Sequence, residues 1–420
     1  MPEVLTIWPD SILFFMRAKG RLNTATGPAK LKLPQAQAAT WGERALALAV
    51  RLGAEDVTVH ALNNIGSARN HVHEFDPPRG LELLRDSLRR ALALGLAHDA
   101  CRAYFNLGED LVGLCRYAEA RAVFEELYVY SQRVQAQIFP GGAFRRLAAL
   151  DWSCGRWAEV LERWPALLKL STGVWGVWAA RLVGRIYNDL GRIEMARLEM
   201  ERTLPRVLKW GEVQIIVPHL EQLARAYAAL GAEAEAGQTI QHFLDLIDRS
   251  PYLDWSCTMA VIFACSWYTT RPETLAAAHA CLPRLERAHS QFHTLESEAA
   301  LAEGQGIIAL AEGASPTATH HFRQAAAAWE ALGRPYDQAR ALKSLGSALH
   351  AWHTQHPQAG PVDSYLSSAR PALAQALAIL DSLAAQVSDP VLKTSFLGSQ
   401  LYREVRQAQA RLDARFPKTA

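Results

Sequence analysis

The amino-acid sequence predicts an all-α fold, an α-solenoid of about eight helix pairs that form a right-handed superhelix. Its main support is a small residue that recurs at intervals of 36 to 42 residues, at Gly66, Gly108, Ala148, Gly184, Ala224, Cys265, Gly306 and Gly346. A fixed period in this range is typical of repeat arrays. Half of the residues are hydrophobic, and in residues 41–53 and 81–95 they recur at three- and four-residue spacing, as on one face of a helix. Alternation of β-branched residues is nearly absent, so we expect little or no sheet.

The expected helix pairs follow one another from about residue 40 to residue 385. We expect turns between the paired helices near residues 113–117, 155–157, 191–193, 231–233 and 313–316. A glycine at the end of the first helix can adopt the left-handed conformation that lets the chain double back. The first pair has a longer turn with Pro77 and Pro78, and in the sixth pair Arg271-Pro272 replaces the glycine turn. The eighth pair has a long connection, from about residue 354 to residue 363.

The sequence around each recurring position resembles the tetratricopeptide repeat. The second repeat shows the pattern in Tyr104, Leu107, Gly108, Leu111, Tyr117, Ala120, Phe124 and Leu127. The recurring residue and the alanine twelve positions later must be small because the two helices approach closely there. The period of about 40 exceeds the 34 residues of the standard repeat, so we expect each helix to be roughly one turn longer.

Three segments are expected: residues 1–35 of unclear role, the solenoid over residues 36–390, and a C-terminal capping helix and tail over residues 391–420. No apolar run is long enough to cross a bilayer, and the run at residues 12–16 is too short for a secretory signal. The six cysteines form no C-x-x-C motif and are expected to be core residues in a reducing compartment. We therefore expect a cytoplasmic protein with no membrane partner.

Composition and motifs favour a non-catalytic protein. A net charge of +2 argues against direct nucleic-acid binding, which needs a concentrated basic surface. The sequence lacks the phosphate-binding loop, the zinc-protease motif and the nucleophile elbow. His350, His353 and His356 are spaced by threes, but no cysteine or carboxylate lies nearby to complete a metal site, so we expect solvated histidines. We expect no enzyme activity, no catalytic residue, no metal and no cofactor.

The expected binding surface is the concave face, which the first helix of each repeat lines in solenoids of this kind. Repeats three to five place arginine and tryptophan at inward offsets, and the candidate site residues there are Arg145, Trp152, Trp178, Arg181, Arg185 and Asn188, with Glu221 and Arg225 at the same offsets of the fifth repeat. Guanidinium groups match carboxylates bidentately, and tryptophan offers stacking area. We therefore expect a protein or peptide partner with acidic or carboxylate groups, and a small-molecule effector stays open. The alternative is that arginine is common throughout the chain and tryptophan fills wide gaps between helices.

Asn64 and Asn106 occupy equivalent positions in the first two repeats. In tetratricopeptide proteins that bind extended peptides, asparagines of this kind hydrogen-bond the ligand backbone. The resemblance therefore implies a peptide-holding stretch in repeats one and two. The alternative is a local structural role, in which each asparagine side chain hydrogen-bonds to its own turn or to the neighbouring helix.

A narrower resemblance rests on three stretches, residues 60–66, 326–335 and 376–380. They look like the repeat region of large bacterial signalling ATPases of the LuxR-type and STAND classes, in which the solenoid is the sensor arm. This chain has no phosphate loop, and its last 30 residues lack a recognisable DNA-reading helix pair. The resemblance thus implies a scaffold or sensor that binds protein or peptide in bacterial signalling. The alternative is a regulatory part of such a transcriptional regulator, with the ATPase and DNA-binding parts outside this chain.

Overall fold

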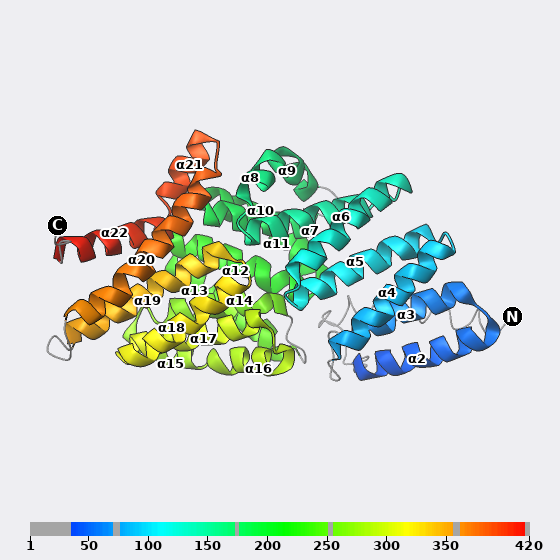
Figure 1. The fold of residues 1–420 in the computed structure, drawn as a ribbon, viewed down its shortest axis with the longest axis horizontal. Coiled ribbons are helices and arrows are strands. Elements are labelled where there is room, and N and C mark those ends of the chain that lie inside the picture. The colour runs from blue at the N-terminus through cyan, green and yellow to red at the C-terminus, as the bar shows by residue number, and fades with distance from the viewer. Residues whose placement is uncertain (1–34, 70–75, 173–175, 251–254, 356–361, 416–420) are drawn as a thin grey trace. The chain divides into compact units, whose positions relative to one another are not determined.

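The computed structural model describes residues 35–69, 76–172, 176–250, 255–355 and 362–415. These residues form helices and connecting turns, with no strand among them, which confirms the all-α fold (Figure 1). Residues 1–34, which make up nearly all of the expected N-terminal segment, lie outside the described part. None of the helices in these ranges is both long and apolar enough to span a membrane.

Eight consecutive helix groups carry the eight recurring small residues, each in the first helix of its group. We number them repeats 1 to 8: α3 (Glu55–Arg69) with α4 (Pro77–Ala93); α5 (Ala97–Gly113) with α6 (Tyr117–Arg133); α7 (Phe139–Ser153) with α8 (Trp157–Glu162) and α9 (Trp164–Thr172); α10 (Gly176–Asp189) with α11 (Ile193–Trp210); α12 (Val213–Ala229) with α13 (Glu233–Arg249); α14 (Thr258–Tyr268) with α15 (Leu275–His279) and α16 (Leu282–Phe292); α17 (Leu295–Ala311) with α18 (Ser315–Ala331); and α19 (Pro335–Gln355) with α20 (Val362–Ala385). Helix α2 (Gln35–Leu52) precedes them, and α21 (Pro390–Leu397) and α22 (Gln400–Arg415) follow. The predicted array of helix pairs is therefore confirmed.

The recurring small residues lie where the two helices of a repeat come closest. A Cβ atom added to Gly108 would lie 2.6 Å from Cζ of Phe124, and one added to Gly306 would lie 2.9 Å from Cδ1 of Phe322. Ala120, twelve positions after Gly108, is fully buried. Protein interiors are packed too densely to accept an extra carbon at such contacts without rearrangement. Steric exclusion thus explains the period.

Most predicted turns have the expected left-handed glycine. Gly155, Gly191, Gly231 and Gly313 have φ angles of 75°, 72°, 75° and 78°. In repeat 2 the turn lies at the predicted residues, 113–117, but Gly113 is the last residue of α5 and Cys115 takes the left-handed conformation, with φ 61°. The turn still closes in the usual way, since the amide N–H of Cys115 donates to the carbonyl of Val112 at 3.0 Å.

Proline interrupts the second helix of repeat 3 and lies in the turn before the second helix of repeat 6. In repeat 3, α8 ends before Trp164-Pro165 and α9 begins there, because proline has no N–H to continue the helix. In repeat 6, the Arg271-Pro272 step leads into a 3₁₀ turn (η2, Pro272–Thr274) and the short helix α15. The degenerate turn predicted for repeat 6 is therefore confirmed, whereas the break in repeat 3 was not predicted.

The chain is divided into two compact units. Unit 1 contains the described residues up to Leu147, together with Gly176, Val177 and Leu204–Ile216. Unit 2 contains Ala148–Thr172, Trp178–Thr203 and the described residues from Val217 onward. Repeats 1 and 2 thus belong to unit 1, and repeats 5 to 8 lie largely or wholly in unit 2.

Within unit 2, contacts join segments that are far apart in the repeat order. The side chain of Gln386, just after α20, donates through Nε2 to the carbonyl of Gly155 at 2.8 Å and accepts from the amide of Trp157 at 2.8 Å, across 229 residues. A Cβ atom on Gly191 would lie 2.8 Å from the carbonyl oxygen of Ser395 in α21. Repeats in an open solenoid contact only their neighbours. The turns of repeats 3 and 4 instead pack against repeat 8 and α21, so this part of the array closes on itself.

Candidate functional site

In unit 1, Asn64 and Asn106 lie in a polar cluster that joins the first helices of repeats 1 and 2. Arg102 of α5 donates to the side-chain oxygen of Asn64, and its Nη1 lies 2.8 Å from Nδ1 of His60. Asn106 donates through Nδ2 to Oδ1 of Asn63 at 2.6 Å. Both asparagines therefore bind the neighbouring helix, which is the local role that the sequence left open.

Charge and burial hold this cluster in place. His60 also contacts Asp99 at 3.5 Å, and this interaction is the main reason that the pKa of Asp99 lies below its ordinary value. Burial lowers the pKa of Arg102, and the charge of Asp99 partly offsets that effect. Arg102 and Asn106 remain half-buried, as does Phe105 between them in sequence. The cluster thus presents a cation, an amide and an aromatic ring in fixed positions.

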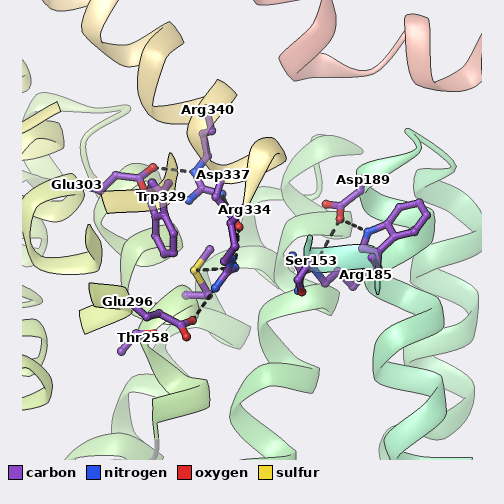
Figure 2. A network of polar contacts seen from close by, with 12 residues as sticks. Ser153, Arg185, Asp189, Thr258, Glu296, Glu303, Trp329, Arg334, Asp337 and Arg340 are labelled. Atoms are coloured by element: carbon purple, nitrogen blue, oxygen red, sulfur yellow. Dashed lines mark hydrogen bonds and ion pairs between the residues drawn. The ribbon is translucent and has the colours of Figure 1, made fainter. Parts of the chain in front are cut away.

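In unit 2, four of the predicted residues follow one another along α10. Trp178, Arg181, Arg185 and Asn188 are all half-buried. Arg185 donates through Nη1 to the hydroxyl of Ser153 at 3.1 Å, and its Nε lies 3.6 Å from Asp189 (Figure 2). Asn188 donates through Nδ2 to the backbone and side-chain oxygens of Gln222 in α12, at 2.9 and 3.0 Å.

The structure corrects the expected placement of Trp152. Its side chain is buried, with 1% exposed, and its ring stacks parallel to that of Trp157 with centroids 4.1 Å apart. Its Nε1 donates to Asp189 at 2.8 Å. The contacts of Gly155 and Trp157 with repeat 8 cover this end of α7, so the indole is a core group and not an open stacking platform.

Arg145, the other predicted member from α7, is also buried, with 2% exposed. The next residue, Arg146, pairs with Glu109 of α5 and is buried as well. Arg145 was predicted to be an exposed cation on the concave face, but its side chain is buried inside unit 1. The sequence could not distinguish the two because the same offset faces either solvent or an adjoining helix.

A buried network of charges joins repeats 7 and 8, and sequence reasoning missed it. Its members are Glu296, Glu303, Trp329, Arg334, Asp337 and Arg340 (Figure 2). Arg334 lies 2.7 Å from Glu296 and 2.6 Å from Asp337, and its guanidinium group covers the ring of Trp329. Although burial opposes ionisation, Arg334 and Arg340 hold the pKa of Asp337 below its ordinary value. Each carboxylate has a cation, as buried charges require.

Arg225 and Tyr336 lie near the α10 residues but come from other repeats. Arg225, on α12, donates through Nε to Glu221 at 2.7 Å, and its guanidinium group lies over the ring of Phe263. Tyr336, at the start of α19, packs against Trp157 with ring centroids 5.8 Å apart. Burial raises the pKa of Tyr336, Asp189 raises it further, and Arg225 lowers it. The inward offset identified Arg225, but no sequence signal identified Tyr336.

The described residues contain no group of three His, Cys, Asp or Glu side chains placed to hold a metal ion. Of the spaced histidines, His353 is buried, which corrects the expectation of a solvated side chain, and His356 lies outside the described residues.

Comparisons with known proteins give no family. No protein-family model matches the chain, and no curated protein matches it. One similar solved structure is that of the APC/C hetero-tetramer Cut9-Hcn1, with 12% identity over 86% of this chain and 67% of that chain and a TM-score of 0.45. Another is a circular tandem repeat protein with novel repeat topology and enhanced subunit contact surfaces, with 16% identity over 90% of each chain and a TM-score of 0.16. Neither likeness informs function. The consecutive helix pairs with their recurring small residues make the chain a tetratricopeptide-like helical-repeat protein.

Proposed function

We propose that this chain is a non-catalytic scaffold that binds a protein or peptide segment on the first helices of its repeats. The observation that carries the proposal is the polar cluster of unit 1. Its side chains bond to one another across α3 and α5, and three of them, His60, Arg102 and Asn106, remain partly open to solvent. Side chains that are already held in place lose little conformational entropy when a partner binds.

The chemistry of the cluster favours an extended segment with an acidic group. Arg102 supplies a permanent cation, which attracts a carboxylate. Asn106 supplies amide groups of the kind that match a peptide backbone, and Phe105 supplies apolar area. The proposal keeps Asn64 as the residue that positions Arg102, since it accepts a hydrogen bond from that guanidinium group.

The row on α10 extends the same proposal to unit 2. Trp178, Arg181, Arg185 and Asn188 stay candidates because they are half-buried side chains on one helix. Arg145 and Trp152 are left out because both are buried.

Narrower roles rest on the sequence alone. A sensor in bacterial signalling, or the regulatory part of a LuxR-type or STAND regulator, follows only from the resemblance of the repeat sequences. The expected division into residues 1–35, 36–390 and 391–420, and the cytoplasmic location, likewise stay predictions.

The test is selection of peptides from a random library displayed on phage, with the full chain as bait. We expect selected peptides to carry Asp or Glu and to bind the Arg102→Gln and Asn106→Ala variants about tenfold more weakly, because a hydrogen bond to a charged group contributes about 1.5–3 kcal/mol. Arg116→Gln is the matched control, since Arg116 is an exposed arginine that pairs with Glu119 at a turn. Failure to select any peptide, or equal binding by all variants, would refute the proposal.

A further inference from the structure

Two arginines of unit 2 share an arrangement in which the cation is more exposed than its carboxylate partner. The side chain of Arg185 is 27% exposed against 14% for Asp189. The side chain of Arg225 is 28% exposed against 5% for Glu221. In both pairs the carboxylate is therefore the more buried partner, and the guanidinium side chain is the one more accessible to solvent.

These guanidinium groups retain unused donors. Arg185 uses Nη1 for Ser153 and Nε for Asp189, and Arg225 uses Nε for Glu221. Within the described part of the chain, Nη2 of Arg185 and both terminal nitrogens of Arg225 have no hydrogen-bond partner. The hydroxyl of Tyr336 has none there either, since the contact of this residue is the ring packing on Trp157. The three side chains are half-buried, and unused N–H and O–H donors are what a carboxylate ligand needs.

Hydrogen bonds and ring contacts link the three residues within unit 2. Asn188, three residues after Arg185, bonds to Gln222, which lies three residues before Arg225. On the other side, Asp189 bonds to Trp152, Trp152 stacks on Trp157, and Trp157 contacts Tyr336. These two chains of contacts place Arg185 between α12 and the start of α19.

The charges of these groups act on one another. Arg225 and Arg340 lower the pKa of Tyr336 while Asp189 raises it. Arg185 and Arg225 both lower the pKa of Asp189, against the larger effect of burial. Charges influence one another in this way only over short distances, because solvent and salt screen longer ones.

We propose that Arg185, Arg225 and Tyr336 form a binding site for a small monocarboxylic acid with an apolar body. The forked guanidinium groups match a carboxylate, and the Tyr336 hydroxyl donates a further hydrogen bond to it. The half-buried ring of Phe263, which contacts Arg225, supplies apolar surface for the rest of the ligand. The site is independent of the peptide surface proposed for unit 1, and it takes Arg185 from the α10 row of unit 2.

The local charge balance favours one negative charge over two. Asp189, Glu221 and Asp337 lie close to the arginines and offset most of their charge. A dianionic phosphate would therefore gain little and would meet these carboxylates at short range.

The probe is 3-phenylpropionate, titrated into the full chain by isothermal titration calorimetry. Its amide tests the carboxylate, phenyl phosphate tests the charge, and a tetrapeptide ending in phenylalanine with a free carboxyl group tests a peptide terminus. We expect 3-phenylpropionate to bind at least tenfold more tightly than each of the other three. Absence of binding, equal binding of the amide, or tighter binding of the phosphate or the tetrapeptide would overturn the proposal.

The variants separate this site from general effects on folding. Tyr336→Phe removes a hydroxyl that has no partner, so it should leave stability unchanged and weaken binding of 3-phenylpropionate about tenfold. Arg185→Gln should weaken it by at least as much. Tyr187→Phe is the matched control, because Tyr187 packs on Trp164 and not on Trp157. Arg102→Gln should not change this affinity, so failure of the peptide proposal and of this one are distinguishable.

Discussion

The steric explanation of the repeat period can be tested with one chemical change made at two glycines. Gly108 lies in the interior of α5, and a Cβ atom there would lie 2.6, 2.7 and 2.9 Å from three ring atoms of Phe124. Gly237 lies in the interior of α13 and would meet nothing within 4 Å. Alanine is favoured over glycine in a helix by about 1 kcal/mol. Gly237→Ala should therefore stabilise the protein by up to about 1 kcal/mol.

Gly108→Ala gains the same helix propensity but must displace a buried aromatic ring. Overpacking of this kind costs about 1–3 kcal/mol, and Phe124 is fully buried, so the ring has little room to move. We expect a net loss of about 1–2 kcal/mol, and therefore a difference of about 2–3 kcal/mol between the two alanine variants. Gly184→Ala should fall between them, because its nearest contact is the flexible end of Met200.

Urea titrations followed by circular dichroism would measure these free energies of unfolding. A second check is Phe124→Leu, which should reduce the cost of Gly108→Ala when the two changes are combined. If Gly108→Ala and Gly237→Ala changed the stability in the same direction, close helix approach would not be the reason for the small residue.

Three further predictions concern buried charges and one turn. Burial lowers the pKa of His219 to about 4, so the unfolded chain takes up a proton first as the pH falls. The free energy of unfolding should therefore drop by about 3 kcal/mol between pH 6.5 and pH 4. Urea titrations at both pH values should show a smaller drop for His219→Leu, and an unchanged drop would contradict the role given to His219. Arg334→Leu leaves Asp337 without one of its cations and should lower the free energy of unfolding by about 3–5 kcal/mol. Arg116→Leu, at an exposed pair, should lower it by less than about 1 kcal/mol. Similar losses of thermal stability in the two variants would refute the expected difference. Cys115→Gly should stabilise the protein by about 1 kcal/mol because it relieves a left-handed backbone, and a lower urea midpoint would refute this.

The candidate binding residues of repeats 3 to 5 were only partly predictable from the sequence. The position of a residue in a helical repeat indicates which way its side chain points, but it does not indicate what the side chain contacts there. The offsets correctly grouped Arg181 and Arg185 on one helix, but they also selected Arg145 and Trp152, which the fold buries. The same limitation hid Tyr336, whose position depends on a contact with Trp157 from a distant repeat.

The network around Arg334 was equally invisible, for a related reason. Arg334 and Asp337 are close in sequence and look like an ordinary exposed pair at a helix start. Their burial depends on Glu296 and Trp329 from repeat 7, which only packing brings against them. A charged side chain affects stability strongly when burial removes its hydration, and the spacing of residues in the sequence does not show which charges become buried.

The sequence by itself determined the helix pairs, their order and most of their turns, because these depend on local steric rules that act within about 40 residues. Gly108 against Phe124 is one such rule, and the left-handed Gly155 is another. Only the tertiary structure shows that Gln386, just after α20, hydrogen-bonds to Gly155 in the turn of repeat 3. It also decided which inward side chains become core and which stay open. Those outcomes depend on how small rotations add up over successive repeats, and no single repeat encodes that sum.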